Sequence, residues 1–389
     1  MPVHDYAIVH YHEIGLKGRN RSTFENILIR NLAAALNGTD AARPRKLPGR
    51  VLVGLPEDAD RELVAERLQR VFGVANVGLG VGSRADLDAL CEVAWDVVRE
   101  REFATFAVRA RKAHSQFAPS AREINEKVGA YLLERSGRRV NLSEPDLTCH
   151  IEIVGDLVIV YVDRLRGAGG LPVGSSGKVL ALISSGIDSP VAAARMMRRG
   201  SRVVFAHFHS QPFTDGSSVR QAAEIIELLT RYQYTSTMYV IPLAPAQQLI
   251  AASCPESLRT LLYRRMMMRI ATGIARHESA GALVTGDSLG QVASQTLENL
   301  AVVEDAAGMP VLRPLVGRDK EEIVAEATGI GTFGVSSAPC QEACVLFEPR
   351  RPATKATVDQ VRAAEAGLDL DALVAAATND SEVRTFRFP

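Results

Sequence analysis

The 389-residue sequence predicts a multidomain protein with an α+β first half and an α/β second half. The length exceeds what a single ordinary core uses, which indicates two or three domains. After residue 178, apolar strand-like runs alternate with helical segments, a pattern typical of a parallel sheet with right-handed crossovers. Between the halves, residues 166–177 are rich in Gly, Ser and Pro and poor in apolar anchors, which predicts a linker.

Two α+β units are expected before the linker, because strand-like and helical periodicities alternate there. In the first unit we expect strands at 5–11 and 50–55 and helices at about 20–36 and 58–72. In the second we expect helices at 86–100 and 120–135 and strands at 103–110, 147–154 and 156–163. Cys91 and Cys149 fall at apolar positions of these elements, so both are predicted to be core residues.

The second half is expected to form one parallel sheet flanked by helices. The predicted strands are 179–183, 202–208, 237–241 and 282–285, and the predicted helices are 190–199, 217–231, 256–276 and 319–328. Met266, Met267 and Met268 are expected to pack on a buried helix face. Ligands bind at the carboxyl ends of such strands, where the segments VLALISSGIDSP, VVFAHFH and ALVTGD each end.

The segment VLALISSGIDSP at residues 179–190 carries the most chemistry. An apolar strand ends in a Ser/Gly/Asp loop that leads into a helix, and amide groups at a helix N-terminus can cradle a phosphate. Gly186 permits close backbone approach, Ser184 and Ser189 offer hydroxyls, and Asp188 suits a helix cap or a magnesium contact. An ordinary strand-to-helix turn is the alternative. The preceding GSSGK is not a Walker A loop, because it lies before the strand.

Charge is balanced overall, with 45 basic and 45 acidic residues, but it is uneven along the chain. Residues 14–50 carry eight Lys/Arg against two acids, and residues 99–139 carry ten against five. Either a phosphate-binding face or solvated surfaces explain these segments. The N-terminus lacks the features of a signal peptide, and no apolar run approaches the roughly 20 residues of a membrane span, so a cytosolic protein without membrane contact is expected.

The chain resembles the tRNA 4-thiouridine synthetase (tRNA sulfurtransferase, ThiI) family along essentially its whole length. HYHEIGLKGRNRSTFE, VNLSEPDLTCHIEI, LISSGIDSP, YRRMMMRIA, VTGDSLGQVASQTLENL and PRRPATKAT follow one another in the family's order. The resemblance implies a ferredoxin-like domain at 1–60, an RNA-binding THUMP domain at 61–165, the linker at 166–177 and a Rossmann-like ATP pyrophosphatase (PP-loop) domain at 178–389. Ser185 departs from the family loop, which has a second glycine there, and its β-carbon is expected to narrow the loop.

The family's nucleotide contacts fall on residues of three strand ends and one helix. They are Leu182, Ile183, Ser184, Gly186, Asp188, Ser189, His207, Phe208, Arg264, Gly286 and Gln295. Apolar side chains among them can pack an adenine, and Arg264 can neutralise a phosphate, with Lys178 and Arg265 as further candidates. ATP and Mg²⁺ are the implied cofactors, and no metal site made by protein residues alone is expected. Core and surface roles are the alternatives for these residues.

Sulfur chemistry is assigned by the resemblance to Cys344, with Cys340 four residues before it. Adenylation of the uridine carbon-4 oxygen creates a leaving group that a persulfide or hydrosulfide can displace. A Cys340–Cys344 thiol pair is preferred over an iron–sulfur cluster with Cys254, since no ligand spacing for a cluster is present. The resemblance is to the form of the family that lacks the C-terminal rhodanese-like domain of many relatives, so no such domain is expected.

The expected function is thus ATP-dependent formation of 4-thiouridine at position eight of tRNA. Candidate RNA contacts are Lys17, Arg19, Arg21, Lys112 and Arg138. The expected partners are tRNA, a cysteine desulfurase or another sulfur donor, and a second copy of the chain. Two alternatives remain at this point. One is an adenylating enzyme for another acceptor, including a sulfur-carrier protein in thiamine thiazole synthesis, and the other is a tRNA-binding protein whose catalysis has decayed.

Overall fold

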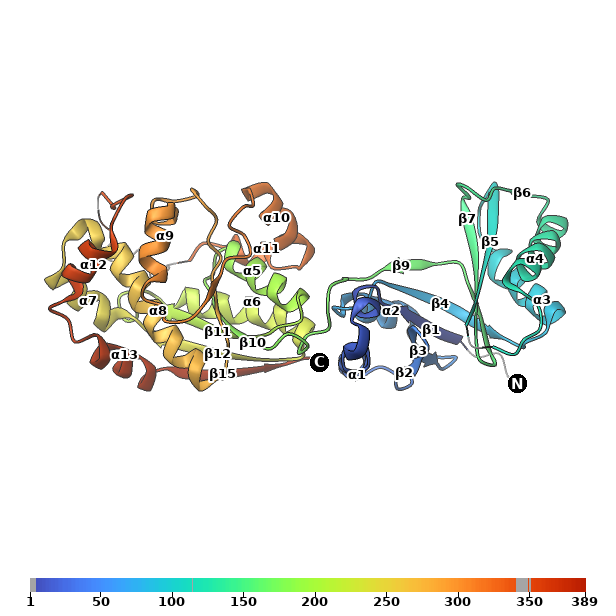
Figure 1. The fold of residues 1–389 in the computed structure, drawn as a ribbon, viewed down its shortest axis with the longest axis horizontal. Coiled ribbons are helices and arrows are strands. Elements are labelled where there is room, and N and C mark those ends of the chain that lie inside the picture. Colours follow the sequence, from blue (N-terminus) through green and yellow to red (C-terminus); the bar gives the residue numbers. More distant parts are fainter. Residues whose placement is uncertain (1–4, 114, 341–348, 350) are drawn as a thin grey trace. The chain divides into compact units, whose positions relative to one another are not determined.

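A computed structural model describes residues 5–113, 115–340, 349 and 351–389. The chain forms two compact units, Met1–Pro172 and Val173–Pro389, which we call unit 1 and unit 2 (Figure 1). Within the described residues, no helix is both long and apolar enough to cross a membrane.

Unit 1 is built on one nine-stranded sheet with the strand order β2-β3-β1-β4-β8-β7-β5-β6, and β9 also pairs with β4. Its strands are β1 Asp5–His10, β2 Arg45–Leu47, β3 Arg50–Leu55, β4 Asn76–Ser83, β5 Thr105–Ala113, β6 Arg139–Val140, β7 Leu147–Val154, β8 Leu157–Tyr161 and β9 Arg164–Arg166. Its α-helices are α1 Arg21–Ala35, α2 Arg61–Arg70, α3 Leu87–Val98 and α4 Ala121–Ser136. The two predicted α+β units therefore share one sheet, joined where β4 pairs with β8.

Strand β4, with the sequence NVGLGVGS, is not among the predicted strands, and glycines weaken a strand interior. Its glycines are required by close packing. A β-carbon at Gly78 would lie 2.7 Å from the ring of Tyr161, and one at Gly80 would lie 2.6 Å from the carbonyl oxygen of Val160. The missing side chains let β8 and its aromatic residue approach the backbone of β4, which permits the continuous sheet.

Unit 2 contains a six-stranded sheet of order β14-β13-β10-β11-β12-β15. Its strands are β10 Lys178–Leu182, β11 Arg202–His209, β12 Thr235–Pro242, β13 Leu283–Val284, β14 Val311–Leu312 and β15 Glu382–Arg387. Its α-helices are α5 Asp188–Arg198, α6 Ser217–Gln233, α7 Ala244–Ser253, α8 Arg259–His277, α9 Leu297–Glu304, α10 Lys320–Gly329, α11 Phe333–Ser336, α12 Val358–Glu365 and α13 Leu370–Asn379. The strands β14 to β12 run parallel, which confirms the predicted α/β class.

Helices cover both faces of this sheet. Helices α5 and α6 contact β10, β11 and β12, whereas α8 contacts β10 and β13 and forms a layer with α7, α9, α12 and α13. The largest core cluster lies on the α8 side, and it contains Met266, Met267 and Met268, as predicted. Cys91 and Cys149 are 1% and 0% exposed, so their predicted core positions are also confirmed.

Two expectations for this region are wrong in part. The sheet is not purely parallel, since the C-terminal strand β15 pairs antiparallel with β12 at the sheet edge. The linker is not poor in apolar anchors either. Leu171 and Val173 are each 4% exposed, and in unit 1 the amide of Gly73 donates to the carbonyl of Gly169 at 2.7 Å. The composition of the linker predicted a segment poor in apolar anchors, but tertiary contacts hold it in place.

Candidate nucleotide-binding site

The loop between β10 and α5 is organised by serine hydroxyls. The backbone amide of Ser184 donates to Ser189 Oγ at 2.8 Å, and the amide of Gly186 donates to Ser184 Oγ at 3.2 Å. Helix α5 begins at Asp188, so the loop leads directly into a helix N-terminus. Such an end presents amide groups and a positive dipole to an anion, which is the arrangement needed to hold phosphates.

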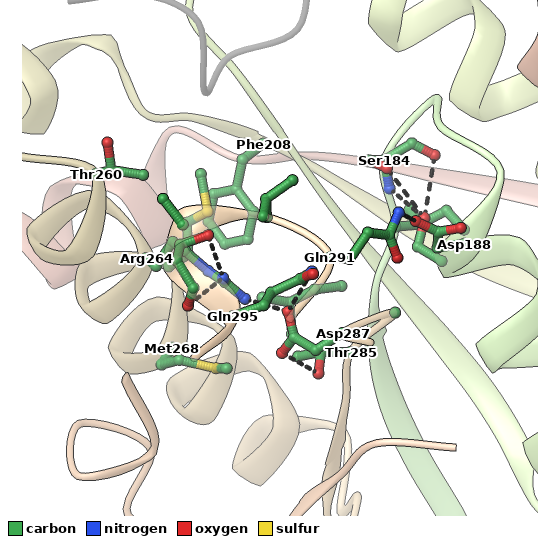
Figure 2. Close-up of a pocket in the computed structure, with 18 of the residues that line it drawn as sticks. Ser184, Asp188, Phe208, Thr260, Arg264, Met268, Thr285, Asp287, Gln291 and Gln295 are labelled. Atoms are coloured by element: carbon green, nitrogen blue, oxygen red, sulfur yellow. Dashed lines mark hydrogen bonds and ion pairs between the residues drawn. The ribbon is translucent and has the colours of Figure 1, made fainter. Parts of the chain in front are cut away.

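A pocket of about 490 Å³ opens at this loop, at the carboxyl ends of β10, β11 and β13 (Figure 2). Ten of the eleven predicted nucleotide contacts line it, and the exception is Gly186. The ten are Leu182, Ile183, Ser184, Asp188, Ser189, His207, Phe208, Arg264, Gly286 and Gln295. The volume lies in the range of small-molecule sites, so the pocket can accept a ligand of nucleotide size.

One wall of the pocket is apolar. Phe208, Met267 and Met268 line it together with Leu182 and Ile183, which gives flat and adaptable surfaces suited to a base. His207 also lines the pocket but is 3% exposed, and its two ring nitrogens contact the carbonyl of Ile183 at 2.9 Å and Ser218 Oγ at 3.3 Å. Burial lowers the pKa of His207 to about 4, so this side chain is neutral near pH 7. It supports the floor of the pocket as an uncharged group.

Arg264 is held in place by an acidic partner that the sequence analysis did not select. Its guanidinium pairs with Asp287 and donates to Ser294 Oγ at 3.0 Å (Figure 2). Asp287 also accepts from Thr285 Oγ1 at 2.7 Å and from Gln295 Nε2 at 3.3 Å. Burial acts to raise the pKa of Asp287, but the charge of Arg264 and these hydrogen bonds outweigh it, and the pKa is lowered. The carboxylate therefore stays ionised and fixes the arginine at the pocket wall.

Asp188 meets two further polar side chains at the edge of the loop. Its carboxylate lies 2.6 Å from Lys320 Nζ and accepts from Gln291 Nε2 at 3.0 Å. Lys320 begins α10, more than a hundred residues away in sequence, so no local pattern indicated it. Asp188 lies at the end of the pocket opposite Arg264 in Figure 2, so this contact places a second basic group beside the loop.

Lys178 and Arg265 do not serve this site. Lys178 pairs with Glu278 at 3.0 Å, and Arg265 is 1% exposed and pairs with Glu365 at 2.9 Å. Neither residue lines the pocket. Their expected phosphate contacts are wrong, because both side chains are occupied by carboxylates elsewhere in unit 2.

The loop also contacts the start of the predicted sulfur segment. Ser185 is 1% exposed, and its Oγ lies 2.9 Å from Cys340 Sγ. The segment before Cys340 is tied down as well, since Gln221 Nε2 donates to the carbonyl of Ala338 at 3.2 Å. Ser185 is absent from the pocket lining, so its side chain is turned to the cysteine rather than to the pocket.

Two other cysteine hypotheses have different outcomes. Cys344 lies outside the described residues, so its predicted role stays a prediction. Cys254 is buried and its thiol donates to the carbonyl of Ala364 at 3.2 Å. Among the described residues, no group of three or more His, Cys, Asp or Glu side chains is placed to hold a metal ion.

Replacing Ser185 with alanine should make Cys340 react about three- to tenfold faster with iodoacetamide. The substitution removes a hydrogen bond of ordinary strength that holds the thiol against the loop. The rate is measured by mass spectrometry of the native protein. Ser337→Ala in the same segment is the control, because Ser337 Oγ donates to the carbonyl of Phe333 instead. Equal rates for Ser185→Ala and wild type would show that this contact does not restrain the thiol.

Replacing Gly286 with alanine should weaken ATP binding at least about tenfold. A β-carbon at Gly286 would lie 2.7 Å from the amide nitrogen of Ser189 and 2.9 Å from the carbonyl carbon of Asp188. Both atoms belong to the backbone of the first turn of α5, and this backbone cannot shift without a loss of stability. The substitution should therefore displace the amides that we expect to hold the phosphates. Isothermal titration calorimetry measures the affinity. Gly317→Ala, where a β-carbon meets nothing within 4 Å, is the matched control and should bind ATP like wild type.

The predicted RNA contacts lie in unit 1 and differ in how they are held. Arg21 donates to Glu25 Oε1 at 2.8 Å and to the Tyr11 hydroxyl at 2.9 Å. Lys112 Nζ donates to the carbonyl of Pro119 at 3.3 Å, and Lys17 Nζ lies 5.1 Å from the ring centroid of Phe24. Arg19 and Arg138 are exposed. Two of the five basic groups are therefore engaged in internal hydrogen bonds.

Sequence reasoning missed several residues of the site. Thr260, Thr285, Asp287, Gln291 and Ser294 line the pocket, and Lys320 contacts Asp188. Thr285 and Asp287 carried a usable signal, since Thr285 ends the predicted strand at 282–285 and Asp287 lies two residues after it, in the segment ALVTGD. The others come from a loop and two helices whose approach depends on the fold.

The chain matches three protein-family descriptions in sequence order. Residues 6–78 match the ThiI ferredoxin-like domain, residues 84–163 match the THUMP domain, and residues 174–370 match Thiamine biosynthesis protein (ThiI). The last match covers about half of the chain and includes every residue of the pocket.

Individual relatives are similar over nearly the full length. The chain is 42% identical over 379 residues to a probable tRNA sulfurtransferase of Moorella thermoacetica, covering 97% of each chain. It is also 42% identical to a probable tRNA sulfurtransferase of Thermus thermophilus, covering 97% of this chain and 93% of the relative. Among solved structures, a 4-thiouridine synthetase–RNA complex with bound ATP matches with a TM-score of 0.91 and 34% identity, covering 99% of this chain and 100% of that one.

Proposed function

Since the chain belongs to the ThiI family of tRNA sulfurtransferases, we propose that its nucleotide pocket activates a tRNA uridine, which then receives sulfur carried by a cysteine. The protein is an enzyme that uses ATP to transfer sulfur to tRNA. The product we propose is 4-thiouridine at position eight. The observation that carries the site assignment is the pocket itself, which joins the phosphate-type loop, an apolar wall and Arg264.

In the proposed first step, the carbon-4 oxygen of the uridine attacks the α-phosphorus of ATP and pyrophosphate leaves. The amides at the start of α5 and the serine hydroxyls of the loop hold the phosphates, while Arg264 and Lys320 offset the negative charge that develops. The apolar wall with Phe208 holds the base and limits the access of water. The product of this step is a uridine joined to AMP through its carbon-4 oxygen.

Magnesium fits this site, because the ion is typically held by one or two carboxylates together with substrate phosphates and water. Asp188 is the carboxylate at the loop, and its oxygens already meet the cation Lys320. Bound magnesium would neutralise phosphate charge and assist the departure of pyrophosphate. The chain's own contribution is to place Asp188 and Lys320 on two helices that start beside the loop.

In the proposed second step, the terminal sulfur of a persulfide on Cys344 attacks carbon-4 and AMP leaves. The thiolate of Cys340 then attacks the Cys344 sulfur, which releases 4-thiouridine and leaves a Cys340–Cys344 disulfide that an external thiol must reduce. The position of Cys340 beside Ser185 supports this role, since it places a thiol next to the loop. A cysteine desulfurase or another persulfide donor would recharge Cys344.

The remaining proposals concern partners and setting. Unit 1 would bind the acceptor region of the tRNA through contacts that include Lys17, Arg19, Arg21, Lys112 and Arg138. The protein would act as a homodimer in the cytoplasm. The division into residues 1–60, 61–165, 166–177 and 178–389 also stays a prediction.

The test is thiolation of unmodified tRNA by the purified protein. The reaction contains ATP, Mg²⁺, cysteine and a cysteine desulfurase, and nucleosides are identified by mass spectrometry. We expect 4-thiouridine, with AMP and pyrophosphate formed in equal amounts. Pyrophosphate without thiolated uridine would favour another acceptor, such as a sulfur-carrier protein in thiamine synthesis. Binding of tRNA without pyrophosphate release would favour the decayed enzyme.

A further inference from the structure

One face of the nine-stranded sheet in unit 1 gathers arginines from strands far apart in sequence. The register shows this directly. On β5 and β7, Arg109 lies opposite His150 and Arg111 lies opposite Glu152, and residues paired in this way share a face. The same face continues through β8 to β4, where Gly82 lies opposite Ile159. Strand β9 adds two more arginines beside β4, so the face carries Arg109, Arg111, Arg164 and Arg166.

This arginine face is the side of the β5–β8 region that the helices leave open. Helices α3 and α4 pack on the opposite side, where Val108, Cys149 and Ile151 form a core with Leu90 and Ile124. On the arginine face, the buried cluster contains only strand residues of β1, β3 and β8 with their partly buried neighbours. The side chains of the four arginines are exposed there. The face is therefore a strand surface open to a partner.

The positive charge of this face is not cancelled internally. Among the described strand residues, Glu152 is the one carboxylate with this orientation, and it is 3% exposed. It is already satisfied by an ion pair with Arg50, by His10 Nε2 at 2.7 Å and by the Tyr161 hydroxyl at 2.7 Å. Among the described residues, the side chains of Arg111, Arg164 and Arg166 have no hydrogen-bond or salt-bridge partner, in contrast to those of Arg101 and Arg122.

The charges of these arginines also affect the pKa of His150, which lies on the same face. Burial first, and then the charges of Arg164, Arg109 and Arg111, lower the pKa of His150 to about 4. The neutral ring of His150 stacks on Tyr161 with ring centroids 5.0 Å apart. His150 therefore adds no positive charge to this face near pH 7, and it supplies no counter-ion for the arginines.

We propose that the arginine face binds the phosphate backbone of the tRNA substrate. Successive arginines on one face of a strand stand about 7 Å apart, and the two strands β5 and β9 extend the charge across the sheet. A broad cationic strand surface suits a polyanion bound by its shape and charge, as in recognition of double-stranded RNA. This proposal rests on the proposed tRNA function and assigns its contact surface. It assigns RNA contacts that charge counts along the sequence did not single out.

The experiment measures tRNA binding by the full-length protein across a salt series. In the double variant Arg111→Gln, Arg164→Gln, we expect about a tenfold or greater loss of affinity and a slope of log K against log salt that falls by about one to two. The matched control is Arg99→Gln, Arg122→Gln, which removes the same charge at the C-terminal end of α3 and on α4. Each control arginine is exposed and paired with a carboxylate, and this variant should bind within about twofold of wild type.

The outcomes separate the two levels of the proposal. If wild type fails to bind tRNA at all, the proposed function fails. If wild type binds and the Arg111, Arg164 variant binds like the control with the same salt slope, the arginine face is wrong while the function stands. The charge-preserving variant Arg111→Lys, Arg164→Lys should recover most of the affinity and the slope. A loss as large as in the glutamine variant, at unchanged slope, would indicate structural damage and overturn the assignment.

Discussion

Replacing Cys344 with serine should abolish formation of 4-thiouridine, by at least about a thousandfold, while ATP-dependent pyrophosphate release continues. A serine hydroxyl cannot accept a transferable sulfur, so the activated uridine has no sulfur to receive. Adenylation should persist because the pocket is built from β10, β11, β13, α8 and neighbouring loops, and the proposed first step uses no thiol. Nucleoside mass spectrometry and a coupled pyrophosphate assay measure the two steps in the same reaction.

The matched control for this variant is Cys254→Ser. That cysteine is buried and donates a hydrogen bond to Ala364, so its replacement tests the loss of a thiol from unit 2 without touching the loop. Thiolation should continue in this control. Thiolation by Cys344→Ser at more than a few per cent of the wild-type rate would assign the sulfur-carrying role to another residue or to free hydrosulfide. Loss of both steps would mean that the substitution disturbs the pocket.

Replacing Asp188 with asparagine should lower the rate of pyrophosphate release about a hundredfold, with thiolation falling in parallel. Asparagine keeps the volume of the side chain and an oxygen that can accept from Lys320, but it removes the charge that we propose holds magnesium at the phosphates. A higher concentration of magnesium should recover part of the rate. The initial rate is measured with ATP and tRNA at saturation.

The control for Asp188 is Asp371→Asn, because Asp371 also lies in the first turn of a helix, α13, and does not line the pocket. Both substitutions remove one favourable charge at a helix N-terminus, so a general loss of helix stability would appear in both. Only Asp188→Asn should change the magnesium dependence. A wild-type rate for Asp188→Asn would remove the carboxylate from the proposed mechanism.

Local sequence was sufficient for the parts of the site that lie in one strand and its following loop. The apolar run of β10 followed by Ser184, Gly186 and Asp188 predicted a phosphate-type turn, and the turn forms with its serine hydroxyls bonded to loop amides. The same logic placed His207 and Gly286 at the ends of parallel strands, and both line the pocket. In such a sheet the carboxyl ends meet at one edge, so strand order need not be known in detail.

Contacts between residues that are distant in sequence could not be predicted from local sequence patterns. The pairing of Asp188 with Lys320 joins two helices separated by more than a hundred residues, and the contact of Ser185 with Cys340 spans a similar distance. The predicted phosphate contacts of Lys178 and Arg265 are wrong for the same reason, because Lys178 pairs with Glu278 at the end of α8 and Arg265 pairs with Glu365 of α12. A side chain's partner depends on which elements pack together, which the spacing of residues within one element does not encode.

The sequence by itself determined the α/β class of unit 2, the position of the phosphate-type loop and the apolar faces of the main helices. Each of these follows from periodicity or from backbone chemistry within about 20 residues. Only the tertiary structure decided that the glycine-rich segment 76–83 is strand β4 and that Arg109, Arg111, Arg164 and Arg166 share one face. The physical reason is that strand pairing and register depend on close contacts such as that of Gly78 with Tyr161, which join residues remote in the chain.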